Sequence, residues 1–168
     1  MSENLEYVII KSSASKIVTG ENINFESELT IQMNEHSSFS LAYLGDSFFE
    51  LWCRQKILQS LKNSRQVHLN VVQLVRCQTQ AHLARMIHPL LNNEEEIIYR
   101  QGRNSKTISP PKHAAIKDYR EATGFECLVG YWYLGKQIKR FEELMKRPEI
   151  VAYLKSALPF KILVPDSA

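Results

Sequence analysis

Cysteine, glycine and long apolar runs are all scarce in this 168-residue chain. Its three cysteines lie far apart, and no CxxC pair occurs. This scarcity argues against a disulfide framework or a zinc site and fits a reducing compartment. No apolar stretch approaches the roughly 20 residues that a membrane span requires. The amino-terminal segment has no basic region before its short apolar cluster, so we expect no secretory signal.

What the chain does contain is the composition of one globular domain. Hydrophobic residues make up 44% and charged residues 23%, and this length suits a single core. The charge is unevenly distributed. Residues 1–39 hold six glutamates against two lysines, a net charge of −4, which leaves +7 for the rest. Residues 100–120 alone have a net charge of +5, which indicates either a phosphate-binding surface or a solvated basic loop.

The residue pattern divides the chain into an acidic extension over residues 1–36, partly ordered or disordered, and an all-α domain over residues 37–168. Apolar residues surround the first half of the stretch after Ser38, which predicts a buried helix with Ser38 as its N-cap. We expect one further helix over residues 67–87, closed by Pro89.

The second half of the domain has clear helix boundaries. A helix is expected to begin after an asparagine cap at residues 92–93, because a glutamate-rich first turn follows. The double proline within residues 104–114 predicts a loop. A long helix should run from about Ala115 to Leu134 and end at Gly135. Two amphipathic helices complete the all-α prediction.

Two acidic residues, Asp46 and Glu126, interrupt apolar helical runs in which no side is obviously solvated. An ionised carboxylate removed from water without a partner costs several kcal/mol or becomes neutral through a shifted pKa. Gly45 precedes Asp46, and Gly124 and Gly130 flank Glu126. Because a helical glycine costs up to about 1 kcal/mol relative to alanine, these positions predict a close approach of the two helix backbones. The two carboxylates would then converge.

Convergent carboxylates repel each other unless a cation binds between them. Mg²⁺ prefers oxygen ligands and keeps several waters, and it can promote phosphodiester hydrolysis. Glu50 lies one turn beyond Asp46 and could join such a site. The residues leave a structural alternative open, in which each acid makes an ordinary salt bridge, for example with Arg54 or Arg120.

Three separated motifs, LAYLGDSFFELWCR, RQGRNSK and DYREATGFECLVGYWYL, resemble a known family. Over about residues 39–146 the chain is similar to the ribonuclease III catalytic domain, and most to its short bacterial and plastid form, Mini-ribonuclease III. The resemblance implies a homodimeric helical bundle that hydrolyses double-stranded RNA with Mg²⁺, or with Mn²⁺ as a substitute, and leaves 5′-phosphate ends. It further implies precursor 23S ribosomal RNA as substrate, a large-subunit ribosomal protein as partner, and a bacterial cytoplasm or a plastid as location.

On this resemblance, Asp46 matches the signature aspartate and Glu126 the glutamate of the second acidic motif. Both are expected to be catalytic and to bind metal, and Glu50 is a further candidate ligand. The chain departs from the longer family members at Ala42 and Thr123, where those members have acids. We therefore expect a reduced site, in which water and RNA oxygens complete the metal shell.

The chain also ends without room for the separate RNA-binding domain of the longer members, so RNA affinity is expected to come from the catalytic domain. Cationic and amide side chains suit the phosphates and 2′-hydroxyls of an A-form minor groove, and such contacts read shape more than sequence. The predicted RNA-binding residues are Arg103, Asn104, Lys106, Lys112, His113, Arg76, Gln78 and Arg120.

Two other functions compete with RNA cleavage. A non-catalytic RNA-binding or ribosome-associated domain of the same fold would be favoured by loss of both acids, and both acids are present. An all-α nucleotide phosphohydrolase should carry an ExxE cluster or an HD pair on its metal helices, and neither is apparent. Metal-dependent cleavage of RNA is thus the function that the sequence favours.

Overall fold

A computed structural model describes residues 36–105 and 115–161 of the chain. All regular structure within these ranges is helical, which confirms the all-α prediction. The elements are α3 (Ser38–Leu58), α4 (Ser64–Val75), α5 (Cys77–Ile87), the 3-10 turn η2 (His88–Leu90), α6 (Asn93–Arg103), α7 (Ile116–Leu134), α8 (Ile138–Met145) and α9 (Pro148–Ala157). Residues 1–35 and 106–114 lie outside the described ranges, so the predicted extension and most of the predicted loop stay predictions.

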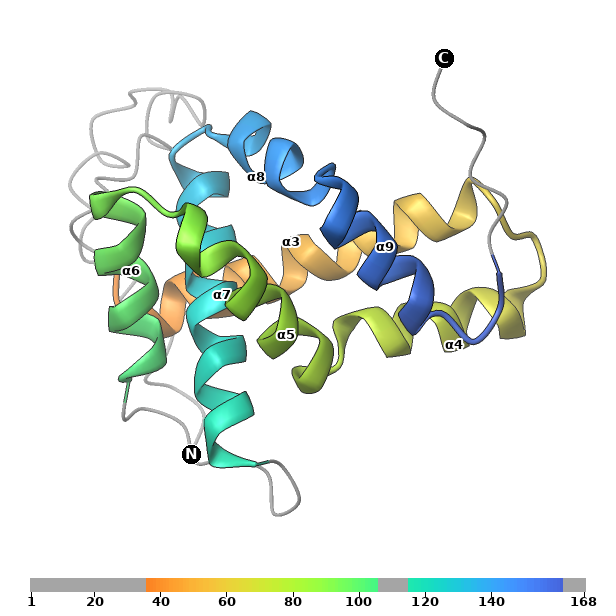
Figure 1. The fold of residues 1–168 in the computed structure, drawn as a ribbon, viewed down its shortest axis with the longest axis horizontal. Coiled ribbons are helices and arrows are strands. Elements are labelled where there is room, and N and C mark those ends of the chain that lie inside the picture. The colour runs from red at the N-terminus through yellow and green to blue at the C-terminus, as the bar shows by residue number, and fades with distance from the viewer. Residues whose placement is uncertain (1–35, 106–114, 162–168) are drawn as a thin grey trace, which may run out of the picture. The chain divides into compact units, whose positions relative to one another are not determined.

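Helix α7 is the centre of the bundle, with α3, α5 and α6 packed around it (Figure 1). From Ala122 to Trp132 every residue of α7 except Glu126 is buried, as a central helix requires, and Phe125, Leu128 and Trp132 have no exposed surface. Helices α8 and α9 follow α7 and pack against each other, with α9 reaching α4 and α5. Across the described ranges, none of these helices combines the length and the apolar character that a bilayer crossing needs.

The helix ends follow local capping chemistry. Ser37, not the predicted Ser38, caps α3, because the Ser37 side chain accepts a hydrogen bond from the Ser40 backbone N–H at 3.1 Å. The predicted asparagine cap is confirmed at Asn92, which forms a capping box with Glu95 at the start of α6. The predicted end of α7 at Gly135 is also confirmed.

The predicted single helix over residues 67–87 is wrong, because the chain breaks at Arg76 into α4 and α5. Arg76 has an extended backbone conformation, with φ −65° and ψ 149°. Thr79 holds the break in place: its hydroxyl donates to the Gln73 carbonyl at 2.6 Å and accepts from Arg76 Nε at 3.2 Å. No glycine or proline marks this break in the sequence, so the hydrophobic pattern runs through it.

Helices α3 and α7 touch backbone to backbone at two glycines. A Cβ atom on Gly45 would lie 1.9 Å from the Glu126 carbonyl oxygen, and one on Gly130 would lie 2.1 Å from the Leu41 carbonyl oxygen. The predicted close approach is therefore confirmed for Gly45 and Gly130. The prediction is wrong for Gly124, whose Cβ would instead meet the Tyr99 ring of α6 at 2.6 Å.

Because of this contact, Gly45→Ala should destabilise the protein, although alanine is the better helix former. Alanine would favour an isolated helix by about 1 kcal/mol, but here its methyl group would collide with the backbone of α7. We expect the substitution to lower the free energy of unfolding by about 2–3 kcal/mol, as overpacking does. Urea unfolding followed by circular dichroism would measure it, with Ser47→Ala on the exposed side of α3 as control. An unchanged or raised urea midpoint would show that α7 leaves room for a methyl group at residue 45.

Candidate active site

The contact between α3 and α7 brings the two acids of the apolar runs to one place. Asp46 directly follows the glycine that meets the backbone of Glu126. The charge of Asp46 contributes to a raised pKa of Glu126, as expected of neighbouring carboxylates. The two carboxylates thus converge, as the sequence predicts. Their roles as catalytic residues and metal ligands stay predictions.

The expectation that both acids avoid solvent is wrong for Asp46, which is exposed, whereas Glu126 is partly buried. Apolar residues of α3 do not all face the core: Tyr43, three residues before Asp46, is 71% exposed. Asp46 therefore lies on a solvated side of α3 despite its apolar neighbours. The carboxylate of Glu126 is the one that is partly removed from water.

Gln80 of α5 holds the Asp46 carboxylate and was missed by the sequence reasoning. The Gln80 side chain is 1% exposed, and its Nε2 donates a hydrogen bond to Asp46 Oδ1 at 3.0 Å. This bond orients one carboxylate oxygen and leaves the other available. A glutamine within an amphipathic helix usually indicates a polar surface, so only the burial of Gln80 reveals its contact.

Burial raises the pKa of Glu126 to about 8, and the nearby charge of Asp46 adds to the effect. Negative charge extends beyond this pair. Burial raises the pKa of the Cys77 thiol and of the Tyr119 hydroxyl, and the charge of Glu126 adds to both, after that of Asp118 in the case of Cys77. The site therefore carries an excess of negative potential, which is the condition that attracts a cation.

The alternative in which each acid makes a salt bridge does not hold for the described residues. No Lys or Arg among them forms an ion pair with Asp46 or Glu126. Arg54 instead pairs with Glu50, to which its Nε donates at 3.0 Å. Because Arg54 already binds the Glu50 carboxylate, Glu50 could serve a metal only if this pair opened, and its role stays a prediction.

The raised pKa of Glu126 sets a pH dependence of stability. The folded protein, with a Glu126 pKa of about 8 against an ordinary 4.5, holds this proton more tightly than the unfolded chain. The free energy of unfolding should therefore decrease as pH rises from about 4.5 to about 8 in metal-free protein, and level off above that. Urea unfolding across this pH range would show the decrease.

Matched variants separate Glu126 from other titrating groups. Glu126→Gln should flatten the pH dependence of stability, because its side chain has no proton to lose. Glu143→Gln changes an exposed acid of α8 and should leave the dependence as it is. Equal pH slopes in wild type and Glu126→Gln would show that another group causes the decrease.

The side chains at this site suit a hard cation that keeps water ligands better than a metal ion that is bound only by protein side chains. Over residues 36–105 and 115–161 there is no group of three or more His, Cys, Asp or Glu side chains that could hold a metal. Two carboxylates at a hydrated position suit Mg²⁺, which retains water ligands, and do not suit tetrahedral zinc. Ala42 and Thr123, the two departures from the longer family members, are both buried and line one hollow with Arg103 and Arg120.

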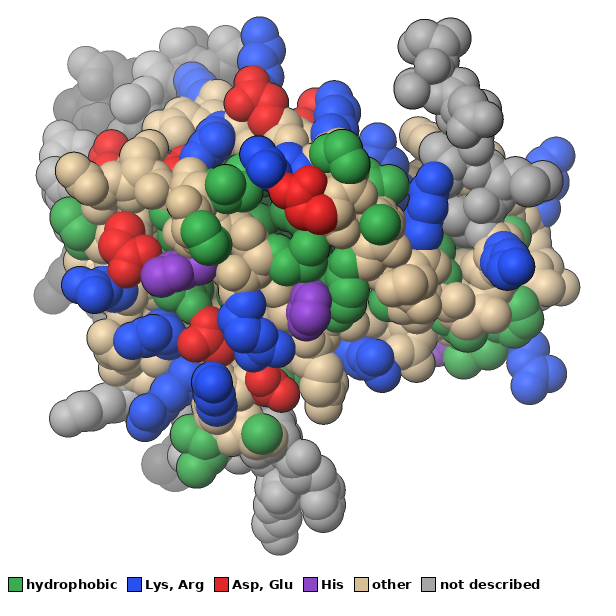
Figure 2. Space-filling view, in the orientation of Figure 1, with side chains coloured by type: hydrophobic (Ala, Val, Ile, Leu, Met, Phe, Trp, Pro, Cys, Tyr) green, Lys and Arg blue, Asp and Glu red, His purple; other side chains and the backbone are tan. Residues whose placement is uncertain are grey.

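Three predicted RNA-binding residues, Arg103, Asn104 and Arg120, line a common groove between the end of α6 and the start of α7. Lys117 lines it too and was missed. Lys106, Lys112 and His113 lie outside the described residues. Arg76 and Gln78 are found at the start of α5, where both are exposed. Figure 2 shows Lys and Arg side chains gathered over the lower parts of α5, α6 and α7, with a few acids among them.

Comparisons with known proteins agree with this architecture. Residues 40–137 match the Ribonuclease III domain. The Mini-ribonuclease 3 of Clostridium tetani is 40% identical over 108 residues, which cover 63% of this chain and 72% of that protein. The Mini-ribonuclease 3 of a Thermoanaerobacter species is 37% identical over 111 residues, covering 66% and 78% respectively.

A solved structure shares the fold of this chain. A crystal structure of a protein from Fusobacterium nucleatum superposes with a TM-score of 0.62 and 29% identity, covering 66% of this chain and 86% of that one. This chain therefore belongs to the ribonuclease III family, among the endoribonucleases of the Mini-ribonuclease 3 type.

Proposed function

We propose that this protein is a Mg²⁺-dependent endoribonuclease that cleaves double-stranded regions of RNA and leaves 5′-phosphate ends. One observation carries the proposal: Asp46 and Glu126 converge where α3 and α7 touch, and no cationic side chain of the described residues neutralises them. The shared Ribonuclease III domain supports the same reaction. Precursor 23S ribosomal RNA is the proposed substrate, and a large-subunit ribosomal protein the proposed partner.

The protein side chains supply position and charge. Asp46 and Glu126 would hold the ion, and Gln80 keeps Asp46 Oδ1 oriented by donating its amide N–H. Glu126 must lose a proton before it binds metal well, because its pKa is raised to about 8. When bound, Mg²⁺ would activate water and offset the negative charge that develops on the scissile phosphate.

The groove of Arg103, Asn104, Lys117 and Arg120 is the proposed contact for an RNA backbone. It lies beside the hollow that contains Ala42 and Thr123, and Arg103 and Arg120 line both. Glu121 shares the groove but accepts the Tyr99 hydroxyl and lies 4.0 Å from Arg103, so its charge is partly engaged. The groove therefore keeps a net positive charge for phosphates.

Arg120→Gln tests this groove through salt dependence. If Arg120 binds one phosphate, its replacement should reduce the slope of log affinity against log salt by about one. Affinity for duplex RNA should be measured by filter binding in Ca²⁺, with Lys139→Gln as a control on the exposed side of α8. Equal salt slopes for wild type and Arg120→Gln would remove Arg120 from the RNA surface.

A homodimer is proposed as the working form, supported by apolar surface on α3 and α4. Leu51 and Leu58 on α3 and Val72 on α4 are 53%, 61% and 43% exposed. Leu58 and Val72 line a groove together with Val67 and Val71. Exposed apolar surface of this kind marks association sites in proteins, and a two-fold pairing would cover it on both copies.

The function is tested by incubation of the purified protein with precursor 23S ribosomal RNA, with Mg²⁺ and with chelator, followed by mapping of both ends. The proposal expects discrete cuts in helical regions only with Mg²⁺, and 5′-phosphates on the products. Binding of duplex RNA without any cut under either condition would instead support the non-catalytic rival. Cuts confined to single-stranded RNA would contradict the substrate class.

A further inference from the structure

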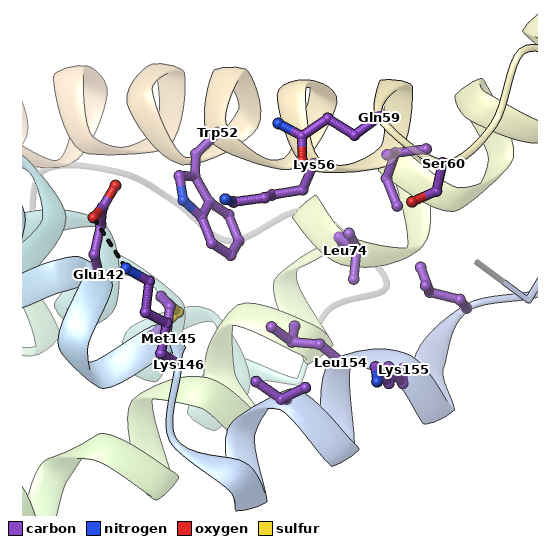
Figure 3. Close-up of a pocket in the computed structure, with 13 residues that line it drawn as sticks. Trp52, Lys56, Gln59, Ser60, Leu74, Glu142, Met145, Lys146, Leu154 and Lys155 are labelled. Carbon is purple, nitrogen blue, oxygen red and sulfur yellow. Dashed lines mark hydrogen bonds and ion pairs between the residues drawn. The ribbon is translucent and has the colours of Figure 1, made fainter. Parts of the chain in front are cut away.

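We propose that the domain has a second ligand site, separate from the carboxylate pair, that takes a small apolar monoanion such as a medium-chain carboxylate. The site is a cavity of about 340 Å³ between α3, α4, α8 and α9 (Figure 3). Its size falls within the roughly 300–1,000 Å³ of small-molecule sites. None of the predicted catalytic or RNA-binding residues lines it, so the inference goes beyond the proposed cleavage.

The cavity walls are apolar. Ile57, Leu74 and Met145 form its buried floor. Partly buried side chains from α3, α9 and the segment after α9 complete the walls: Trp52, Val151, Leu154 and Leu158. Such a lining favours a hydrocarbon or aromatic body over a sugar or a free phosphate, because burial of apolar surface is the main attraction it offers.

The rim of the cavity is cationic. Three lysines, Lys56, Lys146 and Lys155, meet one acid there, Glu142. Glu142 is engaged by Lys146, with Nζ and Oε2 separated by 3.5 Å (Figure 3). Among the described residues, Lys56 and Lys155 have no acidic partner. Two uncompensated lysines beside an apolar cavity are complementary to a ligand with an apolar body and one negative group.

Trp52 supplies a further, independent observation. Its indole Nε1 is buried and has no hydrogen-bond partner among the described residues. A buried donor without an acceptor destabilises a fold. Lys56 lies against the same side chain, with Nζ 5.7 Å from the ring centroid. The α3 wall therefore places the Lys56 cation beside an aromatic side chain that lines the cavity, and an anionic group on an apolar body matches this pair.

Other occupants match only part of this surface. A nucleic acid would satisfy the lysines but leave the apolar walls without a partner. A purely apolar segment, such as the face of a second copy, would fill the walls but leave Lys56 and Lys155 unmatched. An amphipathic anion satisfies both requirements.

Fluorescence titration with anilinonaphthalene sulfonate, an aromatic monoanion, tests the site on the full-length protein. We expect saturable binding, displacement by decanoate, and much weaker displacement by the neutral analogue decanol. Val151→Phe should abolish saturable binding, because the larger ring fills the cavity. Lys56→Gln and Lys155→Gln should each weaken binding about threefold, the effect of one exposed charge, whereas Lys139→Gln should not.

Each contrary result overturns the proposal. Absence of saturable binding would remove the site, and equal displacement by decanol and decanoate would remove the preference for an anion. If Lys139→Gln weakened probe binding as much as Lys56→Gln does, the change would reflect general surface charge and not a site at the cavity. Loss of probe binding as the protein self-associates would assign the cavity to a second copy. The lysine variants change exposed residues, so they decide the question even if Val151→Phe disturbs α9.

Discussion

Asp46→Asn should reduce the cleavage rate of duplex RNA by about a thousandfold or more, because loss of one metal carboxylate removes several kcal/mol of transition-state stabilisation. The fold should be retained. Asp46 is exposed, and the asparagine oxygen can still accept the hydrogen bond from Gln80. Removal of the Asp46 charge should also lower the pKa of Glu126, since that charge helps to raise it. The rate is measured on end-labelled RNA at saturating Mg²⁺.

The control for this variant is Glu149→Gln, which alters an exposed acid of α9. It should cleave at the wild-type rate. Circular dichroism and sedimentation should show the same helical content and association state for both variants and the wild type. Cleavage by purified Asp46→Asn at the wild-type rate would end the proposal that the α3–α7 crossing is the metal site.

Glu95→Ala should lower the free energy of unfolding by about 3–5 kcal/mol, the usual result of breaking a buried ion pair. Glu95 is 1% exposed. Its Oε1 accepts from Trp132 Nε1 at 3.0 Å and from Arg140 Nε at 2.9 Å, and its Oε2 accepts from the Asn92 backbone N–H at 2.9 Å. Truncation leaves the Trp132 donor and the Arg140 guanidinium without their acceptor and removes half of the α6 capping box.

Glu94→Ala is the matched comparison, because Glu94 is exposed in the same first turn of α6. It should cost about 0.5–1 kcal/mol through the helix dipole. Both free energies are measured by urea unfolding at neutral pH. A loss of stability no larger for Glu95→Ala than for Glu94→Ala would show that the buried network contributes nothing beyond the helix-dipole effect.

The parts of the fold that could be predicted are those that local chemistry decides. Gly45 and Gly130 in apolar helical runs predict a backbone contact, since little else explains a helical glycine, and the contact is present. The convergence of Asp46 and Glu126 follows from that contact. The caps at Asn92 and Gly135 follow from side chains that satisfy helix-end groups.

The rest depends on contacts between residues distant in sequence. The sequence pattern places Glu95 in the acidic first turn of a helix. Its burial depends on Arg140, which lies 45 positions later. Gln80 looks like any surface glutamine, and its hydrogen bond to Asp46 spans 34 positions. The break at Arg76 has no glycine or proline to announce it. Periodicity reports which face of a helix is apolar, and it carries no information about such partners.

The backbone contact between α3 and α7 also restricts how the bundle can move. No side chain separates Gly45 from the Glu126 carbonyl, so neither helix can slide past the other by one residue, about 1.5 Å of rise, without collision. The second contact, between Gly130 and the Leu41 carbonyl, lies about one helical turn away and also restrains rotation about the first. Fluctuations of the bundle should therefore be smallest at this crossing, so that the two carboxylates keep a nearly constant separation while the outer ends of α3 and α7 move more.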